Sequence, residues 1–172
     1  MPLIEGAVGR PLQNAGAPSA GTSEVQTLTI GGTPTSGTFK LAFEGFTTAA
    51  ITWSATNATL LANINTALRA LPSLGASEIT AAADSLTAGI GTISLTFAGN
   101  RAKQSVGLIT VANNSLAGTS PTLGITETTP GVDATGRGAG VGQLLLDTTN
   151  AKLYINTGTA LAPTWTVVGS QS

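Results

Sequence analysis

Short segments in which apolar and polar residues alternate, each bounded by glycine or proline, constrain the fold of this chain most strongly. Residues 25–30 (VQTLTI), 38–43 (TFKLAF) and 92–97 (TISLTF) all alternate with a period of two. Successive side chains of a β-strand point to opposite faces, so this pattern predicts strands that each bury one face. Residues 31–34 (GGTP) separate the first two segments, which predicts a hairpin at this point.

Only one segment has the spacing of a helix. Its apolar residues recur every three or four positions and form a single stripe, made by Leu60, Leu61, Ile64, Leu68 and Leu71. Thr56 or Asn57 can cap the first turn, and Pro72 ends the pattern. We therefore predict a helix near residues 58–71 whose stripe faces the core.

The rest of the pattern adds further short strands. These are predicted at residues 50–53, 77–83, 106–111 and 123–128, the last of them at a sheet edge. Residues 37–45 and 91–99 are similar to each other, which places two like strands side by side or in facing sheets. The predicted class is mainly β with one α-helix (α+β), arranged as a compact β-sandwich-like domain.

Changes in composition divide the chain into four parts. Residues 1–24 are predicted to be an extended N-terminal arm, 25–130 the β-rich main domain, and 131–142 a Gly-rich linker. Residues 143–172 are predicted to form a small β-element, with three strands at 143–147, 152–156 and 164–168. Three short strands bury too little apolar surface to be stable alone, so this element needs the main domain or a neighbouring subunit.

Composition narrows the chemistry that the chain can perform. Histidine and cysteine are absent, which excludes a Ser-His-Asp triad, a cysteine nucleophile and the usual zinc ligands. The net charge is −1 and the basic residues are scattered, so we expect no nucleic-acid partner. No apolar run approaches a membrane span and residues 1–6 lack a secretory signal, so we expect no membrane partner and synthesis in the cytoplasm.

A few acidic residues are candidates for a catalytic or metal site. Paired carboxylates could hydrolyse glycosides, but the candidates lie at strand ends or in loops without sugar-stacking aromatics; they are Glu44, Glu78, Asp84, Glu127, Asp133 and Asp147. Asp147 and Asn150 have the oxygen chemistry of a calcium site, yet Asp-Thr-Thr-Asn is a good turn sequence, which we favour. We expect no enzyme activity, no cofactor and no metal.

Two stretches resemble proteins of tailed bacteriophages. Residues 143–158 (QLLLDTTNAKLYINTG), followed by 163–168 (PTWTVV), resemble a hairpin motif of phage head-fibre, tail-fibre and decoration proteins. Residues 27–30, 37–45 and 47–56, with the helix after them, resemble a module of phage structural and bacterial surface proteins. The chain thus resembles a virion structural protein, most of all a capsid decoration (cement) or head-fibre protein.

This resemblance implies a protein of the capsid surface. Its partners would be the major capsid protein and further copies of itself, as a homotrimer near local three-fold positions. We hypothesise that interfaces with the capsid or with other subunits are made by Leu3, Ile4, Val8 and Leu12 of the arm and by Tyr154 and Trp165. A host- or carbohydrate-binding module of a fibre or baseplate, and a tail-tube or head-completion protein, stay open as alternatives.

Overall fold

The computed structural model describes residues 13–15, 18–135 and 138–169, and these form two compact units. The main unit runs from Thr22 to Val132. The small unit combines the described residues up to Gly21 with those from Asp133 onward. Strands dominate and one α-helix is present among the described residues, so the predicted β-sandwich-like α+β class is confirmed.

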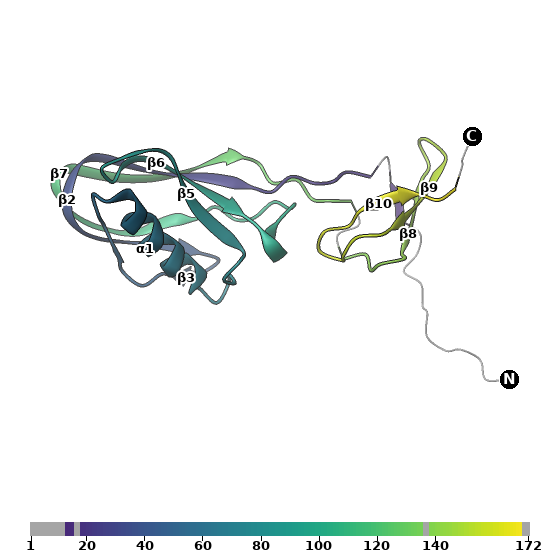
Figure 1. The fold of residues 1–172 in the computed structure, drawn as a ribbon, viewed down its shortest axis with the longest axis horizontal. Coiled ribbons are helices and arrows are strands. Elements are labelled where there is room, and N and C mark those ends of the chain that lie inside the picture. The colour runs from purple at the N-terminus through teal and green to yellow at the C-terminus, as the bar shows by residue number, and fades with distance from the viewer. Residues whose placement is uncertain (1–12, 16–17, 136–137, 170–172) are drawn as a thin grey trace. The chain divides into compact units, whose positions relative to one another are not determined.

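The main unit is a six-stranded sheet with one helix (Figure 1). Its elements are β2 (Val25–Phe43), β3 (Phe46–Thr47), β4 (Ile51–Thr52), α1 (Asn57–Arg69), β5 (Ile79–Thr87), β6 (Ile90–Phe97), the 3-10 turn η1 (Gly99–Arg101) and β7 (Thr110–Thr129). The long strand β2 pairs with β7 along one side over nearly its whole length. On its other side, the first part of β2 pairs with β6 and the last part pairs with β4 and β3. The strand β5 pairs with the far side of β6.

The hairpin predicted at residues 31–34 is wrong, because β2 runs through these residues as one bent strand. Its partner β7 is likewise continuous where two strands were predicted, and the register of the pair shifts between Gly31 and Thr33 and between Pro34 and Ser36. Gly32, Gly37 and Gly118 have φ angles of 70°, 105° and 133°, which residues with a Cβ rarely adopt. The two strands therefore bend together here and keep their hydrogen bonds, whereas a hairpin would have ended the pairing.

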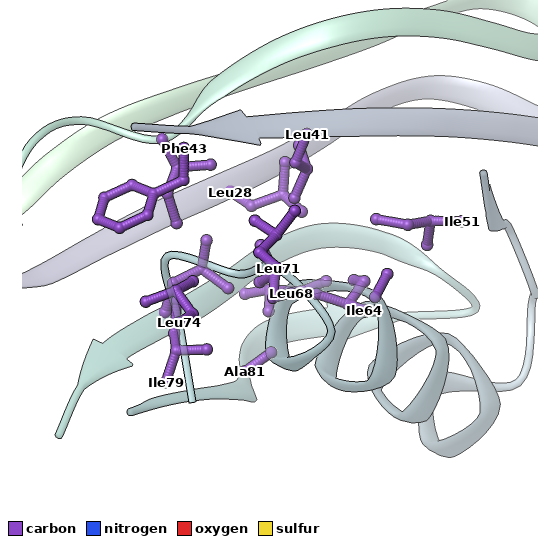
Figure 2. Packing of buried hydrophobic residues seen from close by; sticks show 14 of the residues in the cluster. Leu28, Leu41, Phe43, Ile51, Ile64, Leu68, Leu71, Leu74, Ile79 and Ala81 are labelled. Atoms are coloured by element: carbon purple, nitrogen blue, oxygen red, sulfur yellow. The ribbon is translucent and has the colours of Figure 1, made fainter. Parts of the chain in front are cut away.

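The bend turns both parts of β2 toward one core. Leu28 in the first part and Leu41 in the last part are fully buried in the same cluster. Figure 2 shows these side chains facing the predicted helical stripe, from which Ile64 and Leu68 point toward the sheet. The prediction of a helix with a core-facing stripe is confirmed. The helix ends at Arg69, two residues before the predicted end.

The two similar segments lie on different strands of one sheet and share a core. Residues 37–45 cover the last part of β2 and the turn after it, while residues 91–99 cover β6 and the start of η1. Instead of pairing with each other, they meet through Phe43 and Phe97, whose ring centroids are 5.5 Å apart. Each segment supplies one apolar face to the shared core, which explains their similar patterns.

Side chains of α1 cover one edge of the sheet. Asn65 donates from Nδ2 to the carbonyl of Ala81 on β5 and accepts at Oδ1 from the Ala81 N–H, both at 2.9 Å. Arg69 donates from Nε to the Ile79 carbonyl, and Asn57 bonds the backbone of Leu86 and Gly89 in the same two-sided way. These groups take the place of a neighbouring strand.

The predicted helix cap does not form, for a related reason. Thr56 occupies the N-cap position, but its side chain makes no capping hydrogen bond. The Asn57 side chain is already engaged with β5 and the turn that follows it. Long-range contacts to the sheet have thus displaced the local cap that the sequence favoured.

A buried polar pair fixes the segment that leads into β7. Glu24 and Gln26 are almost fully inaccessible, and the Gln26 amide donates to the Glu24 carboxylate at 2.6 Å. Gln26 also donates to the Gly107 carbonyl at 3.0 Å and accepts from the Ile109 N–H at 2.8 Å. The Gln26 amide therefore satisfies backbone groups that have no strand partner.

The small unit is a four-stranded sheet in the order β1-β8-β9-β10. Its strands are β1 (Gln13–Ala15), β8 (Leu144–Asp147), β9 (Lys152–Asn156) and β10 (Trp165–Val167). The last three match the strands predicted for the small β-element. The first was not predicted: part of the proposed arm pairs in parallel with β8.

Candidate interaction surfaces

The small unit leaves one face of its sheet apolar and open. Residues that pair directly across a sheet share a face, and the registers Leu144 with Ile155 and Leu146 with Leu153 define it. Val168 joins them, since its N–H donates to the Leu153 carbonyl. We call these five residues, Leu144, Leu146, Leu153, Ile155 and Val168, the open face. Leu144, Leu146 and Val168 are 36–39% exposed, and the other two are half-buried.

The opposite face holds the unit's own small core. Leu145, Asp147 and Asn156 are fully buried there. The Asn156 amide donates to the carbonyls of Ala139 and Gly140 and accepts from the N–H groups of Gly158 and Thr164. This face is therefore closed by loops of the same unit.

Tyr154 and Trp165, two of the predicted interface residues, belong to this closed face. Tyr154 pairs with the buried Leu145 and is half-buried. Trp165 is half-buried and donates from Nε1 to the Thr135 carbonyl at 2.7 Å. Their predicted contact with another protein stays a prediction. The other four predicted residues, Leu3, Ile4, Val8 and Leu12, lie outside the described residues.

Exposed apolar side chains gather on the small unit as a whole. Of the nine large hydrophobic residues exposed among those described, six lie between Val141 and Val168. The sequence held a signal for this: in a strand, three consecutive leucines at 144–146 cannot all point to one side. The sequence analysis expected this unit to need a covering surface but named Tyr154 and Trp165 as its interface residues, and so missed the leucines of the open face.

Two of the candidate carboxylates come together around one arginine. Arg101 makes a two-pronged pair with Glu44, at 2.6 and 2.7 Å, and its Nε lies 3.9 Å from Glu78. The guanidinium also lies 5.6 Å from the centre of the Phe43 ring. This cluster ties the turn after β2 to η1. The remaining candidates, Asp84, Glu127, Asp133 and Asp147, do not join it.

The segment at Asp147 is the turn that we favoured. The buried carboxylate accepts from the backbone N–H groups of Thr149 and Asn150 and from the Asn150 side chain at 2.8 Å. The Asn150 side chain, above all, holds the pKa of Asp147 below its ordinary value, and the backbone N–H groups and Lys152 act in the same direction. Desolvation opposes them by raising the pKa.

Two searches for other kinds of site gave no candidate within the described ranges. No cluster of three or more aspartate, glutamate, histidine or cysteine residues is placed to hold a metal ion. No described helix has the length and apolar character needed to cross a membrane.

Comparisons with known proteins found a distant likeness to solved structures. No family model matches the chain, and no curated protein matches it either. A solved structure from Mycobacterium phage Patience is similar to it, with 20% identity and a TM-score of 0.44. The match covers 89% of this chain and 48% of the other, so this chain spans about half the length of that one. A likeness this distant carries neither the fold assignment nor the function proposed below.

Proposed function

We propose that this chain is a structural protein of a tailed-phage particle, and specifically a decoration protein bound to the outer surface of the capsid. It acts by binding, without catalysis or a cofactor. Its partners are the major capsid protein and further copies of itself. The open face of the small unit is the observation that carries this proposal.

The open face supports binding to a large protein surface. Five aliphatic side chains lie on this face beside the exposed Thr166, and none of them carries a charge, which suits an uncharged apolar surface of a partner. Burial of apolar surface contributes about 25 cal/mol per Å², so each copy adds a modest free energy. Many copies acting together would reinforce a shell. The motif at residues 143–158, which resembles decoration and head-fibre proteins, lies on the same sheet.

A binding experiment with purified capsids tests the proposal. Undecorated capsids are incubated with the full chain and with the variant Leu146→Glu, and bound protein is measured after sedimentation of the particles. We expect saturable binding of the unchanged chain at high copy number. We expect at least about a tenfold loss of affinity for the variant, because a buried unpaired carboxylate costs several kcal/mol.

Leu161→Glu is the matched control. Leu161 is 43% exposed in the same unit but lies outside the sheet, so the same change of charge should leave capsid binding nearly intact. Absence of binding by the unchanged chain, or equal loss by both variants, would contradict the proposal.

A further inference from the structure

We propose that a second copy of this chain pairs with the outer edge of β7, over residues 122–129, as an antiparallel strand. The edges of the six-stranded sheet are treated in different ways. The edge at β5 is covered by Asn57, Asn65 and Arg69 of α1, and the short edge at β4 receives Asn63, whose Nδ2 donates to the Thr52 carbonyl. The edge at β7 receives no element of its own unit, since β7 pairs only with β2 among the described strands.

The pairing pattern shows which backbone groups β7 leaves free. The Phe97 N–H donates to the Glu24 carbonyl. The backbone N–H and C=O groups of every second residue from 24 onward, through the first part of β2, therefore point toward β6. The residues between them, such as Thr27 and Thr29, bond to Thr126 and Gly124 of β7. By the same alternation, the N–H and C=O groups of Leu123 and Ile125 point away from the sheet. No hydrogen bond between these groups and another described residue is found.

Next to the bend, side-chain contacts interrupt the outer edge of β7. At the bend, Asn114 accepts from the Leu116 N–H and donates to the Pro121 carbonyl, and Pro121 itself has no N–H to offer. Residues 122–129 have neither feature. We therefore place the partner strand on residues 122–129, where neither feature interrupts the edge.

The character of this segment favours an identical strand as its partner. Proteins commonly protect a free edge with lysine or with charge that points inward, but Glu127 is the one charged residue in all of β7. Antiparallel pairing centred on Ile125 joins the free groups of Ile125 to each other and those of Leu123 to residue 127 of the other copy. The two Glu127 residues are then four positions apart, about 14 Å along the strand, which exceeds the screening length of about 8 Å at physiological salt.

Pairing of two identical antiparallel strands has a twofold axis, so this edge joins copies in twos. The resemblance to phage proteins implies trimers, and the mass of the assembly therefore discriminates between the two modes. The edge lies on the main unit, so the contact does not depend on what the open face binds. Failure of one proposal would leave the other standing.

The test is analytical ultracentrifugation of the full chain over a range of concentrations. We expect a reversible dimer for the unchanged chain. Thr126→Lys places an exposed charge beside the partner strand, where it lies diagonal to its own copy, and should weaken the dimer about tenfold or more. Thr29→Lys is the control, because Thr29 is equally exposed but lies one strand inward, opposite Gly124.

A second measurement needs no variant. Amide hydrogen exchange at Leu123 and Ile125 should slow as the concentration of the unchanged chain rises through the dimer range, while exchange at Leu116 stays constant. A monomer at every concentration, a trimer that Thr126→Lys leaves intact, equal weakening by Thr29→Lys, or unchanged exchange at Leu123 and Ile125 would overturn the proposal.

Discussion

Single polar side chains in this protein stand in for missing strands. Gln26 forms hydrogen bonds with the backbone of the segment before β7, and Asn65 does so with Ala81 on β5. Asn156 forms hydrogen bonds with the loop backbone of the small unit. Each offers both a donor and an acceptor, as a backbone peptide does. Because each of them bonds to backbone groups rather than to water, their loss should be costly for folding.

Gln26→Ala tests this most directly. The substitution leaves the buried Ile109 N–H without its partner and removes one hydrogen bond to the buried Glu24 carboxylate, which keeps the bond from the Val106 N–H. An unsatisfied buried group costs about 1–3 kcal/mol. We expect the free energy of unfolding to fall by about 2–4 kcal/mol in urea denaturation. Gln104→Ala removes an exposed hydrogen bond from the Gln104 side-chain amide to the Asn100 carbonyl. This change should alter stability by less than about 0.5 kcal/mol. Equal effects of the two changes would refute the assigned role of Gln26.

Asp147 gives the small unit a dependence on acid. Its pKa is lower in the folded protein than in the unfolded chain, so its stabilising effect is complete above about pH 4 and is lost as the pH falls through the folded pKa. NMR signals of Thr149 and Asn150 should shift in that acidic range. The Asp147→Asn variant should lack this transition. A transition of the same size in the variant would show that another group is responsible.

Local chemistry at the residue level was predictable, and distant contacts were not. The Asp147 turn involves partners two and three residues away, so its sequence alone identified it. The backbone partners of Gln26, Gly107 and Ile109, lie more than 80 positions away, and alternation showed only that position 26 lies on a strand. The open face was missed for a similar reason, because alternation separates the two faces of a strand without telling which one the protein covers.

At the level of elements, the bend shared by β2 and β7 makes the core possible. It brings Leu28 and Phe39, from the two parts of one strand, into the same cluster. The sequence marked the position correctly, with glycine and proline at 31–34, but a hairpin and a bend use the same residues. The choice depends on β7, which pairs with both parts of β2 from 68 to 104 residues away.

Gly118→Ala tests the need for the bend. Gly118 has a φ of 133°, and an added Cβ would overlap the Thr33 carbonyl across the strand pair. We expect a loss of about 1–3 kcal/mol in thermal or urea unfolding. Gly124→Ala, on the same strand, has open space around the new Cβ and an ordinary φ, so it should be nearly neutral. A neutral Gly118→Ala would show that the bend does not depend on this conformation.

At the level of the whole molecule, the two units differ greatly in the core that each possesses. The cluster of buried apolar residues that fills the main unit runs from Leu28 to Ile109 and includes three phenylalanines. Among the described residues of the small unit, the buried apolar ones are Ala134, Ala139, Leu145 and Pro163. The prediction that the C-terminal strands have too little core of their own agrees with this difference.

Two fragments put the difference to the test. Residues 22–132 contain the whole main core, so this fragment should unfold cooperatively, with a dispersed NMR spectrum. Residues 133–172 lack β1 and retain only the small buried set, so this fragment should stay unfolded on its own. A stably folded 133–172 fragment would show that the small unit is stable without burying its open face against another surface.

The asparagines of α1 that form hydrogen bonds with β5 also affect how copies of this protein can assemble. If β7 pairs as proposed above, the main sheet has one edge for another chain, because α1 covers the edge at β5. Two molecules that pair there would occupy each other's free edge, so the sheet would not extend beyond the pair. A protein made in many copies can in this way keep an unpaired edge strand without forming fibres.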